Sequence, residues 1–137
     1  MINSQHAELR KVDIYVRGST DFRDPKHPGY YTVLIIDVKT DKGKHMECFF
    51  PEDTTPNRLM ILGALTAIQS LKYPCDVTLY TTAPIGLQKA KGPNGEMLRS
   101  LIEAAKEVGH TLTNRYEDPE LVRSRIRLWE NNKGTSL

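Results

Sequence analysis

The 137-residue sequence has little of several features that mark special classes of protein. Its two cysteines, Cys48 and Cys75, and its four scattered histidines show none of the spacings of a zinc site or a disulfide framework. No apolar run approaches the ~20 residues that cross a bilayer, and residues 1–10 lack the apolar segment of a secretory signal. We therefore expect a soluble, cytoplasmic protein with both thiols reduced.

Charge of one sign is not in excess either. The 19 lysines and arginines are balanced by 17 acidic residues, which leaves a net charge of +2. An anionic partner such as nucleic acid is permitted, but a local basic cluster would have to bind it. The chain has the length of one domain, without repeats or linkers. We expect a single domain over residues 11–132, between a flexible N-terminal segment, 1–10, and a flexible tail, 133–137.

A strongly apolar helix is predicted in the middle of the sequence, after a clear start signal. The Thr55 oxygen is placed to cap the first turn, and Pro56 at the first helical position has no N–H to leave unpaired. Between Leu59 and Leu71 the apolar arc is wider than a surface helix needs. The helix predicted over residues 55–71 should therefore lie in the centre of the fold.

Apolar alternation predicts five strands around this helix, over residues 12–16, 29–38, 44–50, 75–81 and 110–116. Residues 17–19 close the first strand, and residues 41–43 form a hairpin turn. A short helical piece is predicted over 85–91, and further helices over 95–108 and 120–131, the last one capped by Asp118 and Pro119. The order β-β-β-α-β-α-β-α indicates one α/β layer structure in which the fourth strand runs parallel to the first.

This element order resembles that of the ribonuclease H family, and three stretches of sequence agree with it. Residues 12–19 are similar to the family's first strand, which ends in Asp-Gly-Ser, and residues 77–82 to its fourth strand, which ends in Thr/Ser-Asp. Residues 54–60, Thr-Thr-Pro-Asn-Arg-Leu-Met, are similar to the Thr-Thr-Asn-Asn-Arg-Met-Glu of the central helix. The resemblance implies a five-stranded mixed sheet, with strands one to three antiparallel, strands four and five parallel to strand one, and helices on both faces.

The family enzyme cleaves the RNA strand of an RNA–DNA hybrid. Carboxylates from the first strand, the central helix, the fourth strand and the last helix hold two divalent metal ions, which stabilise the attacking and leaving oxygens. In this sequence the matching positions are Arg17, Met60, Thr82 and Arg123, none of which is acidic. The histidine loop before the last helix and the basic protrusion of some members have no counterpart. The resemblance therefore implies a catalytically degenerate member, with no catalytic residue, no metal and no cofactor.

Nucleic-acid binding would survive this loss, because a guanidinium pairs bidentately with phosphate without activating water. The predicted binding residues stand at the end of the first strand and the start of the central helix: Arg17, Gly18, Ser19, Thr55, Asn57 and Arg58. We expect them to face one opening and to bind a hybrid or duplex weakly, in a salt-sensitive way. A salt bridge to a neighbouring acid explains Arg17 equally well.

Two other functions stay open on the sequence alone. The first is a protein-interaction or self-association module, in which the altered face or the arginine-rich last helix with Trp129 meets a protein partner or forms a homodimer. The second is a hybrid ribonuclease that uses displaced carboxylates with Mg²⁺ or Mn²⁺. The available acids are Asp21, Asp24, Glu52 and Asp53. Asp13 is excluded, because four residues of strand put it ~13 Å from Arg17.

Overall fold

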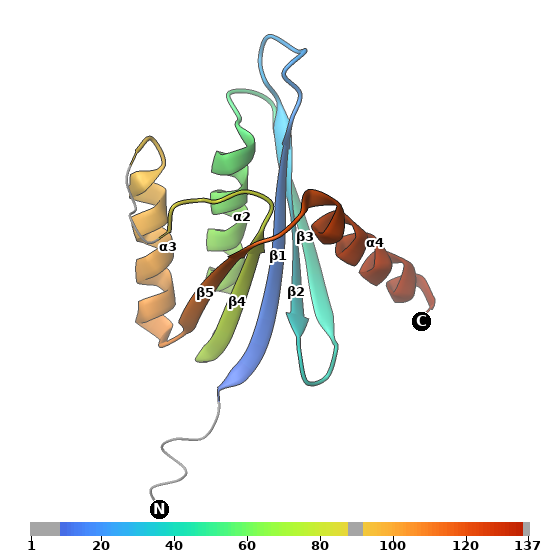
Figure 1. The fold of residues 1–137 in the computed structure, drawn as a ribbon, viewed down its shortest axis with the longest axis vertical. Coiled ribbons are helices and arrows are strands. Elements are labelled where there is room, and N and C mark those ends of the chain that lie inside the picture. The colour runs from blue at the N-terminus through green and yellow to red at the C-terminus, as the bar shows by residue number, and fades with distance from the viewer. Residues whose placement is uncertain (1–8, 88–91, 136–137) are drawn as a thin grey trace, which may run out of the picture.

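The computed structural model describes residues 9–87 and 92–135, with side chains as far as residue 131. Within these ranges the elements are β1 (Arg10–Thr20), β2 (Gly29–Asp37), β3 (Gly43–Phe50), α2 (Pro56–Ser70), β4 (Cys75–Thr81), α3 (Gly95–Val108), β5 (Thr111–Tyr116) and α4 (Pro119–Thr135). The strands form one sheet in the order β3-β2-β1-β4-β5 (Figure 1). Because β1, β2 and β3 are antiparallel and β4 and β5 run parallel to β1, the predicted mixed sheet is confirmed.

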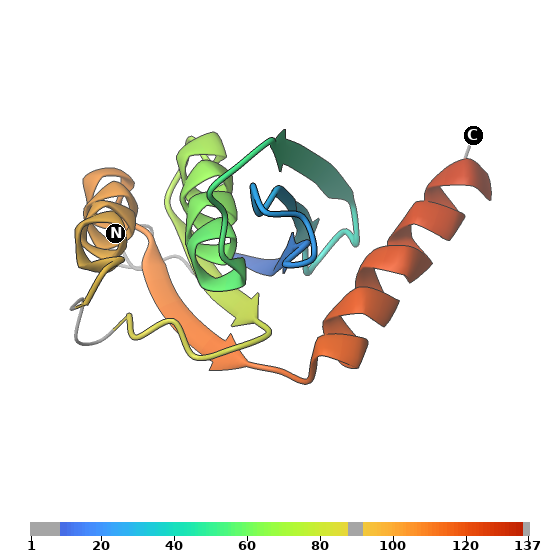
Figure 2. The ribbon, with the colours of Figure 1, turned by 90° about the horizontal axis from the view of Figure 1, so that it is seen from above.

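The helices cover the two faces of the sheet unequally. Figure 2 shows α2 and α3 side by side on one face, whereas α4 lies alone on the other and slants away from the sheet. α2 contacts β1, β2 and α3, and it is the central helix that the sequence predicts. No helix of the described chain has the length and apolarity needed to cross a bilayer.

Each face of the sheet has its own apolar core because side chains alternate along a strand. On the α2 face, Val12, Ile14 and Val16 of β1 are buried against a helix face formed by Leu59, Met60, Ile61, Ala64, Ala67 and Ile68. On the α4 face a smaller core joins Leu34 and Ile36 of β2 to Val122 and Ile126 of α4. Alternate residues of β1 thus belong to different layers.

The start of α2 is attached to the loop that joins β1 to β2. The Thr55 side chain accepts a hydrogen bond from the Arg58 amide at 3.3 Å, as the capping prediction required. The buried Thr54 donates its hydroxyl to the His27 carbonyl at 2.9 Å and lies 2.9 Å from the Thr20 hydroxyl. Strand end, loop and helix start therefore form one connected unit.

The end of β1 approaches the backbone of α2 directly at Gly18. A Cβ at this position would lie 2.4 Å from the Pro56 carbonyl oxygen and 2.9 Å from the Leu59 Cβ. A glycine is needed here for space, and the contact sets the distance between the strand and the helix start.

Some of the predicted limits differ from the structure. β1 does not end at residues 17–19, because its pairing with β2 continues as far as Thr20 opposite Gly29. The helix predicted over 85–91 is wrong for residues 85–87, where Gly86 takes a left-handed φ of 72°, and its remaining residues lie outside the described ones. The flexible end segments stay a prediction, although Arg10 already belongs to β1 and α4 continues to Thr135.

Replacement of Gly18 by alanine tests the close approach of strand and helix. We expect Gly18→Ala to lower the free energy of unfolding by about 1–3 kcal/mol, because a backbone carbonyl cannot move aside for the new methyl group. Urea unfolding measures this. Ser19→Ala, one residue along and on the opposite face, should change the value by less than about 0.5 kcal/mol, and equal midpoints for the two variants would contradict the packing described.

Candidate functional site

Met60 and Thr82, two of the four positions that match family carboxylates, contact each other. Met60 lies on the inner side of α2 with 1% of its surface exposed, and Thr82 follows the last residue of β4. The Thr82 hydroxyl donates to the Met60 sulfur at 3.1 Å. The neighbouring Thr81 hydroxyl donates to the Ala83 carbonyl at 2.8 Å and accepts from the Asn114 amide at 3.3 Å. This end of β4 is therefore filled by side chains that satisfy one another.

Arg17 and Arg123, the other two positions, line one pocket on the α4 face. The pocket has a volume of about 370 Å³ and is lined by Arg17, Tyr30, Thr32, Glu47, Arg123, Ile126, Arg127 and Glu130. Arg17 donates to the Tyr30 hydroxyl at 3.3 Å, and Arg123 pairs with Glu120 one turn before it. Among the described side chains no carboxylate lies within 4.0 Å of the Arg17 guanidinium. The salt-bridge explanation of Arg17 is therefore wrong.

The side chains at the four positions do not fit a pair of divalent metal ions. Mg²⁺ and Mn²⁺ prefer oxygen ligands, whereas a guanidinium has no acceptor atom and a thioether is a soft ligand. Within residues 9–87 and 92–131 no three His, Cys, Asp or Glu side chains are grouped closely enough to hold a metal ion. The side chains at these four positions thus differ in kind from the carboxylates that hold the two metal ions in the family enzyme.

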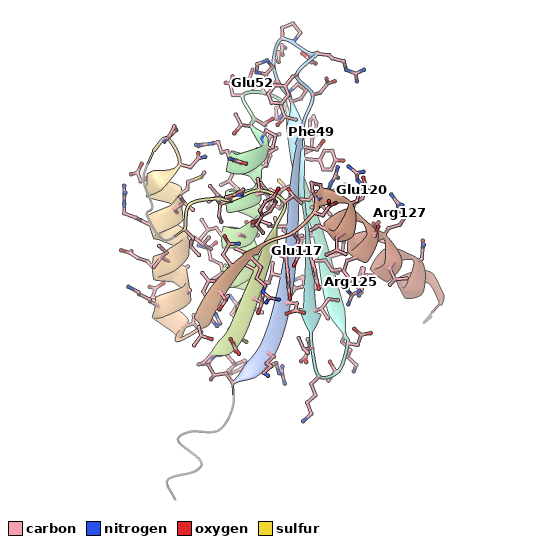
Figure 3. The ribbon with its side chains drawn as sticks, in the orientation of Figure 1. Phe49, Glu52, Glu117, Glu120, Arg125 and Arg127 are labelled. Carbon is pink, nitrogen blue, oxygen red and sulfur yellow. The ribbon has the colours of Figure 1, made fainter. Side chains whose placement is uncertain are left out.

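The acids proposed as replacements belong to loops at one end of the molecule. Asp21 accepts hydrogen bonds from the Arg23 backbone at 3.0 Å and side chain at 3.3 Å, and these bonds lower its pKa. Asp24 accepts from the Lys26 amide at 3.0 Å. Asp53 has a left-handed φ of 57° and is exposed, and Glu52 beside it points outward near the β1–β2 loop (Figure 3). Within the part of the chain that the structure describes, they belong to no group of acids that could hold a metal ion.

The six predicted binding residues do not face one opening, so that part of the prediction is wrong. Gly18 faces α2, and the alternation of β1 therefore puts Arg17 and Ser19 on the α4 side of the sheet. Thr55, Asn57 and Arg58 are exposed at the start of α2, on the other side. The structure brings the residues together as two groups, one on each side of the end of β1.

Sequence reasoning missed three residues beside Arg17. Tyr30 accepts its hydrogen bond, Arg127 lies one helical turn after Arg123, and Phe49 stands opposite Tyr30 in the β2–β3 register. The sequence could have pointed to Arg127, because residues four apart share a helix face and Arg123 already matched a family carboxylate position. No pattern in the sequence points to Phe49, since its place beside Tyr30 depends on the register between β2 and β3.

A second polar group lies lower on the α4 face, around Tyr15 of β1. The Tyr15 and Tyr80 rings are stacked with centroids 4.6 Å apart, and the Arg125 guanidinium lies 5.7 Å from the Tyr15 ring. Arg125 also pairs with Asp41 of the hairpin turn at 3.5 Å. Burial raises the pKa of Asp13 in the same region, and the positive charges of Arg125 and Arg115 oppose this shift.

The fold and the site define an α/β domain of the ribonuclease H-like class. The N-terminal RNase H domain of a Mycobacterium tuberculosis protein aligns with a TM-score of 0.67 at 11% identity, over 81% of this chain and 84% of that one. LC11-RNase H1, solved in complex with an RNA/DNA hybrid, aligns with a TM-score of 0.68 at 18% identity, over 80% of this chain and 86% of that one. At these identities the likeness shows the fold.

Curated relatives extend the comparison to sequence. A Ribonuclease H of Acetivibrio thermocellus is 32% identical over 111 residues, 80% of this chain and 66% of the relative. A Ribonuclease H of Rhizobium johnstonii is 37% identical over 74 residues, 53% of this chain and 45% of the relative. The chain thus spans between about half and two thirds of the length of these relatives. No family model matches it. The chain belongs to the ribonuclease H family.

Replacement of Asp13 by asparagine tests the electrostatics of this face. Because the folded-state pKa of Asp13 is raised, its favourable contribution to folding is complete below the unfolded pKa and is lost as the pH rises through the folded pKa. Asparagine does not ionise. The stability of Asp13→Asn relative to the unmodified protein should therefore increase between about pH 4 and pH 7. Urea unfolding across this range measures it, and a difference that is constant or falls with pH would contradict the buried carboxyl.

Proposed function

We propose that this ribonuclease H-family domain binds nucleic acid, either an RNA–DNA hybrid or a duplex, without cleaving it. The observation that carries the proposal is the chemistry of the four carboxylate-matching positions, where Met60 and Thr82 bond to each other and Arg17 shares a pocket with Arg123. Arg17 and Arg123 offer donors and positive charge to a phosphate, and none of the four side chains offers a carboxylate to a metal ion. The domain is further proposed to act in the cytoplasm without a cofactor.

Binding is assigned to both sides of the end of β1. On one side, the start of α2 presents Asn57 and Arg58 to solvent, and its first turn holds no acidic residue that would offset the positive end of the helix. On the other side, Arg17 offers a guanidinium that has no carboxylate within 4.0 Å among the described side chains. Contacts of this kind position a sugar-phosphate backbone and do not read sequence. The relative solved with an RNA/DNA hybrid supports the choice of ligand.

A protein-interaction or self-association module is the second candidate. Leu121 and Leu128 of α4 are 54% and 53% exposed, and their separation of two helical turns puts them on one side of the helix. Trp129 is not part of that surface, because its ring packs 6.0 Å from the His45 ring of β3. Exposed leucines on one line favour a contact with another α-helix or with a second copy.

Absence of cleavage is the first expected outcome. A labelled RNA–DNA hybrid incubated with the protein and Mg²⁺ or Mn²⁺ should remain intact, because two-metal catalysis needs several convergent carboxylates. Gel electrophoresis of the RNA strand measures this. Two metal ions within ~4 Å of each other at Arg17, Met60 and Thr82 in a soaked crystal would overturn the proposal. So would cleavage that disappears when Asp21, Asp24, Glu52 or Asp53 is changed to alanine.

Salt-dependent binding is the second expected outcome. Arg17→Ala and Arg58→Ala should weaken hybrid binding at every sequence and flatten the plot of log affinity against log salt, by ~0.9 for each phosphate that is no longer neutralised. Asn57→Ala should weaken binding and leave the slope nearly unchanged, since an amide releases no counterion. Fluorescence anisotropy measures both quantities.

Lys72→Ala serves as the control, because Lys72 lies at the opposite end of α2, where it donates to the Gln69 carbonyl. If the unmodified protein binds neither hybrid, duplex nor single strand at low salt, the nucleic-acid proposal fails and the interaction module replaces it. Sedimentation of a variant with Leu121 and Leu128 changed to serine would then test self-association.

A further inference from the structure

A groove follows the α4 side of the sheet between α4 and the β1–β2 loop. Its lower part is the 370 Å³ pocket of Arg17, and its upper part is a second pocket of about 490 Å³ that includes Ser19, Phe22 and Phe49. Tyr30 lines both pockets, so the two are adjacent. We call this surface the arginine–aromatic groove.

The upper part presents aromatic rings to solvent. Ser19, Tyr30 and Phe49 form one cross-strand row over β1, β2 and β3, just beyond the part of the sheet that α4 covers. Phe49 is 66% exposed, and Figure 3 shows it between the first turn of α4 and the β1–β2 loop. Phe22 on that loop is 60% exposed. Two phenylalanines this exposed on one pocket form an apolar surface suited to a flat, apolar ligand group.

The lower part presents positive charge. Arg17 and Arg127 have no carboxylate within 4.0 Å among the described side chains, while Arg123 shares its guanidinium with Glu120. Two acids, Glu47 and Glu130, also line this pocket, and Glu47 accepts from the Thr32 hydroxyl at 3.5 Å. Three guanidiniums thus face two carboxylates, and two of the guanidiniums keep free donors. Such donors match the oxygens of a phosphate group.

The two parts are separated by the distance that one nucleotide spans. The row of Arg17, Thr32 and Glu47 lies two residues along the strands from the row of Ser19, Tyr30 and Phe49, or ~7 Å. A base on the Phe49 ring would therefore put its own backbone phosphate near Arg17 and Arg127. A paired base has its faces covered by its neighbours in the stack, so an exposed ring is useful only to an unpaired base.

We propose that the arginine–aromatic groove binds an unpaired strand of nucleic acid, with a base stacked on Phe49 and the adjoining phosphate on Arg17 and Arg127. The proposal rests on the nucleic-acid binding proposed above, and adds that the α4 side, where Arg17 lies, also accepts an unpaired strand. Modest sequence preference is expected, because every base has a face that stacks on an aromatic ring.

Binding of a fluorescein-labelled oligothymidylate and of a blunt RNA–DNA hybrid, compared by anisotropy at low salt, tests the groove. Phe49→Ala should weaken oligothymidylate binding by about fivefold or more, and Phe49→Leu should weaken it too, because leucine keeps apolar bulk but has no ring to stack. Arg127→Ala should weaken it and flatten the salt slope by ~0.7. Because Phe49 and Arg127 are exposed, urea midpoints should stay unchanged.

Tyr73→Ala is the matched control, since Tyr73 is 79% exposed and lies at the other end of the sheet. It should bind the oligothymidylate like the unmodified protein. Weakening by both Phe49 variants, with hybrid binding retained, supports the groove. Unchanged oligothymidylate binding by both Phe49 variants, or binding of the hybrid alone, overturns the groove and leaves the proposed function standing. Binding of neither nucleic acid overturns both.

Discussion

The contact between the end of β1 and the start of α2 is the constraint on which the rest of this structure depends. Gly18 lets the strand backbone meet the Pro56 carbonyl, and Thr54 joins the same place to the loop through His27. With that distance set, the apolar face of α2 reaches the α2-side residues of β1 and β2, and the Met60 sulfur reaches Thr82. The same contact turns Arg17 and Ser19 away from the helix, because neighbouring residues of a strand face opposite sides.

The chemistry of the site follows from that division into two sides. On the α2 side, the position between helix and β4 is closed by a methionine and a threonine that satisfy each other. On the α4 side, arginines gather beneath an aromatic row, and Arg17 and Arg127 have no carboxylate within 4.0 Å among the described side chains. The polar character of the region is therefore reversed relative to a carboxylate site: donors replace acceptors, and a bound anion would be stabilised where a cation would be repelled. This reversal is a property of the side chains present.

The fold was predictable from the sequence because its signals are local. The Thr55 cap, the proline at the first helical position and the alternation of residues 12–16 each act within a few residues, and all are confirmed. The site was only partly predictable. The pairing of Met60 with Thr82 follows from the family alignment, whereas the neighbourhood of Arg17 depends on strand register and on the angle of α4. Continued pairing with β2 likewise decided the true end of β1, although residues 17–19 were expected to close the strand.

The Met60–Thr82 contact has a consequence for any attempt to build a carboxylate metal site into this domain. Met60 is 1% exposed, so a glutamate there would place a carboxylate in an apolar interior, at a cost of several kcal/mol unless a cation neutralised it. A metal ion would supply that cation only if carboxylates also replaced Thr82 and Arg17. A glutamate at Met60 alone therefore lowers stability and gains no affinity for metal. A carboxylate metal site therefore has to be introduced at these positions in one step, and a library of single substitutions would not find it.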